Sequence, residues 1–288
     1  MALIVCPLCV REDDVFLVST LPDGRKEAEC RDCDFAFTFG AARIEEPPPA
    51  PKKPARAKAA PKKKVVKVVP PRPIAYVVQQ FPKASRVSAD DKARVEALKH
   101  EFLASTPAVA DPNVTSHWNK FRWVFSEDGL EKAVIFDLQL FATDPTGADA
   151  GVPAELHKVW TVMGEFEGAR RVRASTAHLL RGPGELEDRF TELVDGVFPM
   201  AMPGWNEPLL TKTLAVVEPD RFLTVLTYAE KRELLGTLFG LELPDVDGTS
   251  WTIGRLAVWS NDLLAELIGG GFADQQHAVA FLRWARDQ

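Results

Sequence analysis

The sequence predicts a mainly α protein in which a small β module and a disordered linker precede a multi-helix C-terminal domain. Three observations lead to this architecture. All four cysteines lie within the first 33 residues, residues 47–73 contain nine prolines and nine Lys or Arg residues, and apolar residues recur at helical spacing after residue 88. The predicted boundaries are residues 1–44 for the β module, 45–75 for the linker and 76–288 for the helical domain.

The cysteines form two C-x-x-C pairs, Cys6 with Cys9 and Cys30 with Cys33, separated by 20 residues. This spacing resembles that of the four-cysteine zinc ribbons, and it predicts one Zn²⁺ ion held tetrahedrally by the four thiolates. Two disulfides would require an oxidising compartment, and a redox-active pair would require one C-x-x-C beside a βαβ pattern. Because four thiolates leave no open coordination position, we expect the zinc to be structural.

The strands of this module are expected at residues 15–18, 25–30 and 35–39, with a turn at Pro22-Asp23-Gly24. Three strands of this length bury too little apolar surface to be stable alone. Zinc binding is therefore expected to supply the folding energy of the ribbon.

The composition is that of an ordinary soluble globular protein, with 46% hydrophobic and 26% charged residues. No apolar run reaches about 18 residues, which predicts no membrane span. The first residues, MALIVC, do not resemble a signal peptide. These features favour a cytoplasmic location. Association with the nucleoid is compatible with them.

Charge is strongly segregated along the chain. The formal net charge of −6 is made up of −5 in residues 1–46, +9 in residues 47–73 and −10 in residues 74–288. A basic segment between two acidic modules is not an averaged surface and indicates a distinct partner for that segment.

The basic linker has a Lys/Ala/Pro composition that resembles the tails of linker histones. Its proline density prevents regular secondary structure, so we expect it to be disordered or partly polyproline II. Its cations predict sequence-independent binding to nucleic-acid phosphates, with DNA as the expected partner, and the alternative is a solvated linker that uses lysine for solubility. The residues concerned are Lys52, Lys53, Arg56, Lys58, Lys62, Lys63, Lys64, Lys67 and Arg72.

The C-terminal domain is predicted from helix caps and apolar stripes. Ser88 with Asp91 forms a capping box, Asp111 precedes a proline at the first helical position, and Gly182 and Gly269 begin helix-stopping sequences. Residues 134–136 and 222–226 are expected to be buried helical segments or extended connections. Nine or ten helices are predicted, and the clearest contain residues 95–103, 114–125, 156–163, 172–180, 186–194, 209–217, 228–239, 253–268 and 275–284.

Catalytic motifs are lacking from the sequence. It contains no P-loop, G-x-S-x-G, H-E-x-x-H or dinucleotide-binding fingerprint, and its five histidines are predicted to lie on separate helices. Asp137 follows an apolar run, but the Glu-x-Lys that a strand-borne nuclease centre would need is absent. Trp205 falls in a predicted loop and is the tryptophan expected at the surface, whereas most of the other six lie on apolar stripes.

Arg170, Arg171 and Arg173 form a basic cluster on one predicted helix of the otherwise acidic domain. The cluster is suited to binding phosphate. The alternative is local ion pairing with Glu165 and Glu167, which the sequence favours slightly.

Residues 205–285 resemble helical regions that lie beside the ATPase or nuclease parts of bacterial restriction and defence proteins. The resemblance rests on the stretches EPDRFL, from Glu218, and WSNDLL, from Trp259, and it implies a recognition or assembly module. We therefore expect a non-enzymatic, zinc-containing nucleic-acid-binding protein, with a protein partner for the helical domain and a role in regulation or defence. The alternatives are an adaptor with two protein-docking modules and an enzyme whose site is assembled from distant helices.

Overall fold

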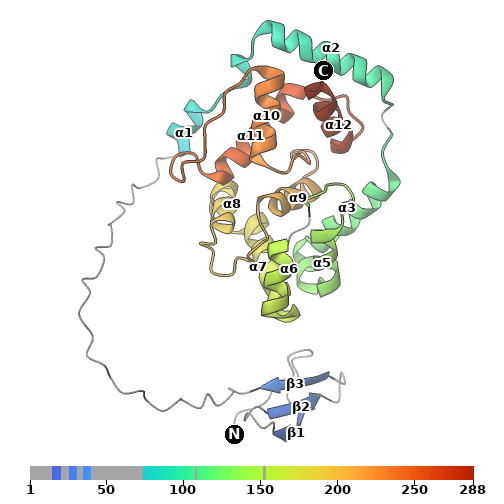
Figure 1. Ribbon diagram of the computed structural model, residues 1–288, viewed down its shortest axis with the longest axis vertical. Coiled ribbons are helices and arrows are strands. Elements are labelled where there is room, and N and C mark those ends of the chain that lie inside the picture. Colours follow the sequence, from blue (N-terminus) through green and yellow to red (C-terminus); the bar gives the residue numbers. More distant parts are fainter. Residues whose placement is uncertain (1–14, 21–25, 31–34, 40–73, 108, 152–153) are drawn as a thin grey trace, which may run out of the picture. The chain divides into compact units, whose positions relative to one another are not determined.

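The structure is a computed structural model that describes residues 15–20, 26–30, 35–39, 74–107, 109–151 and 154–288. The chain divides into two units, Met1–Val66 and Lys67–Gln288. Among the described residues, the first unit contains a small sheet and the second contains helices with irregular connections (Figure 1). The described part of the protein is thus mainly α, as the sequence predicts.

The described part of the N-terminal unit is a three-stranded antiparallel sheet. Strands β1 (Val15–Thr20), β2 (Lys26–Cys30) and β3 (Phe35–Phe39) lie in the order β1-β2-β3. The register between β1 and β2 shifts between Leu17 and Ser19, as at a β-bulge, whereas β2 pairs with β3 without interruption. This arrangement confirms the three predicted strands, with the same bounds for β3.

The C-terminal unit contains twelve α-helices and one 3₁₀ turn within its described residues. They are α1 (Ile74–Gln80), η1 (Ala84–Arg86), α2 (Ala89–Ser105), α3 (Pro112–Val124), α4 (Glu127–Lys132), α5 (Ile135–Thr143), α6 (Ala154–Met163), α7 (Glu165–Arg181), α8 (Leu186–Val194), α9 (Glu207–Val217), α10 (Tyr228–Phe239), α11 (Ile253–Ile268) and α12 (Gln275–Arg286). None of these helices is both long and apolar enough to cross a membrane.

The predicted helix boundaries are set by side-chain caps. Ser88 Oγ accepts a hydrogen bond from the Asp91 N–H at 3.0 Å, and Asp111 Oδ1 accepts one from the Asn113 N–H at 2.8 Å. These bonds satisfy main-chain donors that the first helical turn leaves unpaired. Helix α11 ends at Ile268 as predicted, and Gly269 follows it with φ of 60°, a conformation that favours glycine.

Two helices, α1 and α4, were not predicted, and only the beginning of α5 fell within a segment for which helix was one of the expected states. Helices α1 and α4 have only seven and six residues, too few for a stripe to be recognised. Ile135 and Phe136 begin helix α5 (IFDLQLFAT), in agreement with the helical state expected for residues 134–136. Val134 and Phe136 are exposed, however, so the burial expected for this segment was wrong. Residues 222–226 form a buried connection without helix or strand, one of the two states expected for them.

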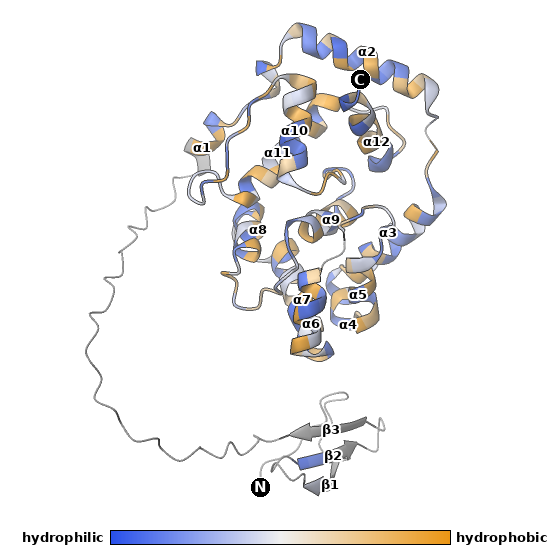
Figure 2. Ribbon diagram, viewed as in Figure 1, coloured by the Kyte–Doolittle hydropathy of each residue, from blue (hydrophilic) through white to orange (hydrophobic). Residues whose placement is uncertain are grey.

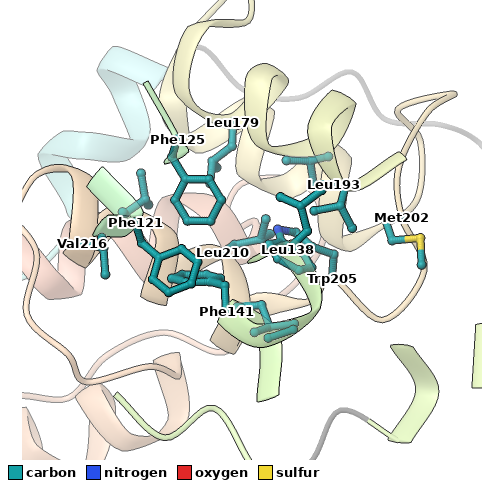
Figure 3. Close-up of a cluster of buried hydrophobic side chains, with 14 of the residues drawn as sticks. Phe121, Phe125, Leu138, Phe141, Leu179, Leu193, Met202, Trp205, Leu210 and Val216 are labelled. Carbon is teal, nitrogen blue, oxygen red and sulfur yellow. The ribbon is translucent and has the colours of Figure 1, made fainter. Parts of the chain in front are cut away.

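One hydrophobic cluster lies among helices α3 to α9 (Figure 3). Its aromatic centre includes Phe121, Phe125, Phe141 and Trp205, and the Phe125 and Phe141 rings meet edge to face with centroids 4.6 Å apart. Trp205 is 1% exposed, so the expectation that it lies at the surface was wrong. The loop position was right, but this loop folds inward and places the indole ring 6.0 Å from the Phe141 ring.

A second hydrophobic cluster joins α2, α10, α11 and α12. Helix α2 lies across α10 and α12 (Figure 1), and hydrophilic and hydrophobic positions alternate along it (Figure 2). Helix α11 contributes Ala257 and Val258 to the first cluster and Leu256 and Leu264 to the second. It is therefore shared by both halves of the core.

Candidate nucleic-acid interface and metal centre

The predicted zinc ligands lie almost entirely outside the described residues. Cys6, Cys9 and Cys33 are outside them, and Cys30 is the last residue of β2. Pairing places Cys30 opposite Val15 on β1 and opposite Phe35 on β3. The end of the sheet at which β1 begins is therefore the end at which Cys30 lies.

The predicted phosphate-binding residues of the linker also lie outside the described residues. They are Lys52, Lys53, Arg56, Lys58, Lys62, Lys63, Lys64, Lys67 and Arg72. Their role stays a prediction that depends on their charge and order in the sequence.

The described part of the candidate interface is the arginine cluster on α7. Glu167 accepts hydrogen bonds from Arg170 Nε and from Arg171 Nε, each at 2.8 Å. The two guanidinium groups lower the pKa of Glu167 to about 2. Arg171 also donates to the Ala201 carbonyl at 3.1 Å, so its guanidinium group is partly used by the fold.

Arg173 is oriented differently from its two neighbours. Its guanidinium group donates to the Ala133 carbonyl, which follows the last residue of α4, and burial lowers the pKa of this group. Arg170, by contrast, hydrogen-bonds only to Glu167 among the described residues, and most of its side chain is exposed to solvent. The sequence indicates that the three residues lie on one helix, but it could not indicate that Arg171 and Arg173 bond to main-chain carbonyls outside α7.

The use of basic side chains to cap helix C-termini recurs throughout the helical unit. The last carbonyls of a helix lack main-chain partners and carry partial negative charge, so a cation bound there stabilises the helix. Seven helices in the described residues receive such a cation from another element: α3 from Arg181, α4 from Arg173, α5 from Lys212, α7 from Arg189, α9 from Arg122, α10 from Arg94 and α11 from Lys99.

Lys212 is the most buried of these caps. Its ammonium group donates to the Phe141 carbonyl at 3.0 Å and to the Asp144 carbonyl, and it lies 4.9 Å from the centroid of the Phe141 ring. Burial lowers its pKa to about 8, although the nearby carboxylate of Asp144 opposes this effect. Asp144 also lies 3.6 Å from Nδ1 of His117, whose pKa is lowered mainly by burial.

A second buried lysine, Lys231, lies between α10 and α11. Its ammonium group donates to the Ala257 carbonyl at 3.0 Å. Burial lowers the pKa of Lys231, and the negative charge of Glu207 opposes this effect. Burial also raises the pKa of Glu207 itself. Glu207 also accepts a hydrogen bond from the Tyr228 N–H at the start of α10.

These buried groups were missed by the sequence analysis. Lys212 interrupts the apolar run of residues 209–217, and that interruption was the available signal. Its partners come from α5, about 70 residues away in the chain, and no local pattern identifies them. Both ammonium groups are bonded to main-chain carbonyls in the core, an arrangement that holds helices together rather than presenting an amine to a substrate.

Metal-binding constellations are not formed in the described part of the chain. No group of three or more His, Cys, Asp or Glu side chains there is placed to hold an ion. The histidines lie on five different helices, as predicted: His100, His117, His157, His178 and His277. Asp137 lies in the first turn of α5 and pairs with Lys120 at 2.6 Å, so it is not part of a strand.

No family model, curated protein or solved structure matches this chain.

Proposed function

We propose that the protein binds nucleic acid, with DNA as the expected ligand, through its basic linker, and that the N-terminal module is a zinc ribbon. The observation that carries this proposal is charge segregation: residues 47–73 contain nine Lys or Arg residues and no acid, whereas residues 74–288 have a net charge of −10. Such a segment neutralises phosphates and releases condensed counterions.

The helical unit is less suited than the linker to bind nucleic-acid phosphates. Seven of its basic side chains are used to cap helix carbonyls, and Arg170 and Arg171 share Glu167. Phosphate would have to displace these contacts in a strongly acidic unit. The linker therefore remains the segment best suited to bind the nucleic-acid backbone.

The zinc proposal rests on the spacing of the four cysteines and on the sheet register. Antiparallel pairing puts the start of β1, six residues after Cys9, beside Cys30, which begins the second cysteine pair. A single site built from both pairs needs this proximity. Cys6, Cys9, Cys30 and Cys33 would hold one Zn²⁺ ion, which would stabilise the ribbon without taking part in chemistry.

The proposal is tested by replacing Lys62, Lys63 and Lys64 with glutamine in the full chain. We expect weaker binding to fluorescein-labelled duplex DNA, measured by anisotropy over a salt series. The slope of log K against log salt should become shallower by about 0.9 for each phosphate contact that is lost. Single-stranded DNA and RNA of equal length would identify the preferred nucleic acid.

The matched control replaces Lys83, Lys92 and Lys158, three exposed lysines of the helical unit, with glutamine. It makes the same change in net charge at a different place and should leave the slope unchanged. Equal effects of the two triple variants would show that net charge matters rather than the linker. Absence of binding at low salt would reject the nucleic-acid proposal.

A second candidate function is that of a protein adaptor. It is favoured by a solvent-open groove with three carboxylates on the helical unit, which is unsuited to nucleic acid. Deletion of residues 47–73 distinguishes the two functions, because it removes the proposed nucleic-acid interface and leaves the helical unit in place.

A further inference from the structure

An open groove of about 880 Å³ lies between helix α10 and the segment that follows it, residues 241–246. Its walls come from one exposed side of α10 and from a stretch that forms neither helix nor strand. The volume is within the usual range for ligand sites. The groove is not used by the fold itself or by the proposed nucleic-acid interface.

Three apolar side chains in the lining of the groove belong to the second hydrophobic cluster. Tyr228, Leu241 and Leu243 are at most 6% exposed, whereas Val246 at the end of the segment is 50% exposed. Leu241 and Leu243 are buried while Glu242 between them is exposed, an alternation typical of extended backbone. A second extended chain beside this segment would cover the exposed side chain of Val246.

The same segment has unused main-chain hydrogen-bonding groups. Leu241 N–H donates to the Leu235 carbonyl, and the Pro244 carbonyl accepts from the Tyr228 hydroxyl. The N–H groups of Glu242, Leu243, Asp245 and Val246 have no protein partner among the described residues. An extended peptide can pair with such groups by strand addition, which gives affinity through the main chain.

Gly236 supports a binding role for this side of α10. Glycine inside a helix is less favourable than alanine, because it loses more conformational freedom on folding. A Cβ added to Gly236 would meet nothing closer than the Leu241 carbonyl oxygen at 3.7 Å. Packing within the chain therefore does not require glycine here, whereas the close approach of a ligand backbone to the helix would.

The charge of the groove selects the ligand. Its lining contains three carboxylates, those of Glu233, Glu242 and Asp245, and one guanidinium group, that of Arg232. Arg232 is paired with Asp245, and Glu242 has no ion-pair partner in the described part of the chain. Cationic side chains of a ligand would be attracted to this lining, and the phosphates of a nucleic acid would be repelled.

From these observations we propose that the groove between α10 and residues 241–246 docks an extended, lysine- or arginine-bearing segment of a partner protein. The segment pairs with the free main-chain groups along one edge of residues 241–246, packs an apolar side chain against Val246 and presents its cations to Glu233 and Glu242. Gly236 leaves room for its backbone. This docking is independent of the nucleic-acid proposal.

The test uses the full chain and a fluorescein-labelled peptide of four Lys-Val repeats, measured by anisotropy. We expect this peptide to bind at least about tenfold more tightly than one of four Glu-Val repeats, because its charge complements the lining. Glu242→Lys should weaken binding about tenfold. Glu266→Lys, the same charge change at an exposed position of α11, should leave it within about twofold.

Gly236→Ala separates binding from folding. We expect it to raise the melting temperature, because alanine favours the helix, and to weaken peptide binding severalfold, because the methyl group narrows the groove. Equal affinity for the two peptides, equal effects of Glu242→Lys and Glu266→Lys, or unchanged binding by Gly236→Ala would overturn the proposal. Tighter peptide binding after deletion of residues 47–73 would also overturn it, because the chain's own basic segment would then be the occupant.

Discussion

At the residue scale, the most informative side chains are two lysines in the core. Lys212 and Lys231 are at most 1% exposed, yet each is bonded to main-chain carbonyls rather than to a carboxylate. A charged ammonium group in such surroundings is penalised by desolvation unless it is well hydrogen-bonded. The folded state consequently holds the proton of Lys212 less tightly than the unfolded chain does.

This difference predicts a pH dependence of stability. The pKa of Lys212 is about 8 in the folded state, and that of an unfolded lysine is about 10.4. Between these values the unfolded chain binds more protons, so the contribution of Lys212 to stability rises from pH 8 to pH 10.4 and is absent below pH 8. In Lys212→Met, urea unfolding should show a flatter rise of the unfolding free energy over this window.

The control for this measurement is Lys158→Met, which replaces an exposed lysine of α6. It should leave the pH profile of the wild-type chain unchanged. If Lys212→Met and Lys158→Met give the same profile as the wild type, Lys212 does not titrate with a lowered pKa.

At the element scale, basic side chains on one helix bind the carbonyls at the C-terminal end of another helix. Arg189, on α8, donates to the carbonyls of Leu179, Gly182 and Gly184 at the end of α7. Arg181 extends the pattern by donating to the Phe125 carbonyl, which follows α3. Caps of this kind fix the angle between consecutive helices as well as satisfying carbonyls, because one rigid fork bonds several oxygens.

Arg189→Met should therefore destabilise the helical unit by about 1–3 kcal/mol, because it leaves several carbonyls without a donor. Thermal unfolding followed by circular dichroism would measure the change. Arg170→Met removes an exposed ion pair on α7 and should lower the stability less than Arg189→Met does. Similar costs for the two variants would show that the caps contribute no more than surface charge does.

Elements with a clear local signal were predicted well. The bounds of α8, α10 and α11 match their apolar stripes, and the caps at Ser88 and Asp111 form as expected. The extent of helix α5 was missed because its largely apolar sequence shows no clear helical period. The surface position expected for Trp205 failed for a similar reason: Met-Pro-Gly-Trp-Asn is a turn sequence, but tertiary packing decides which way a turn faces.

The candidate sites were predictable to different degrees. Ion pairing of the α7 arginines with Glu167 follows from their spacing of three and four residues, which places them on one helix face. The contact of Arg173 with Ala133 spans 40 residues and depends on how α4 meets α7. The groove beside α10 was not predicted either, because its charge and free main-chain groups come together only when residues 241–246 fold back along the helix.

At the scale of the whole molecule, the division after Val66 suggests that the sheet-containing unit and the helical unit fold separately. The proposed metal site belongs only to the first. Each unit would then depend on its own source of stability: zinc for the ribbon, and two hydrophobic clusters for the helices.

Cys6→Ser should accordingly release zinc while leaving the helical signal intact. We expect metal analysis to find less than one ion per chain and far-UV circular dichroism to show an unchanged helical melting transition. Ser19→Ala, a small change at an exposed position of β1, serves as the control and should retain zinc. Loss of the helical transition in Cys6→Ser would show that the two units are one folding domain.

Helix α11 limits how far the helical unit can be divided. Because it lines both clusters, any cut that separates α2, α10 and α12 from α3 to α9 exposes one of its faces, either Ala257 with Val258 or Leu256 with Leu264. A fragment made in this way would present a broad apolar surface and self-associate. Helices α2 to α12 should therefore be kept together when the helical unit is expressed on its own, and insertions are better tolerated in its outer loops than near α11.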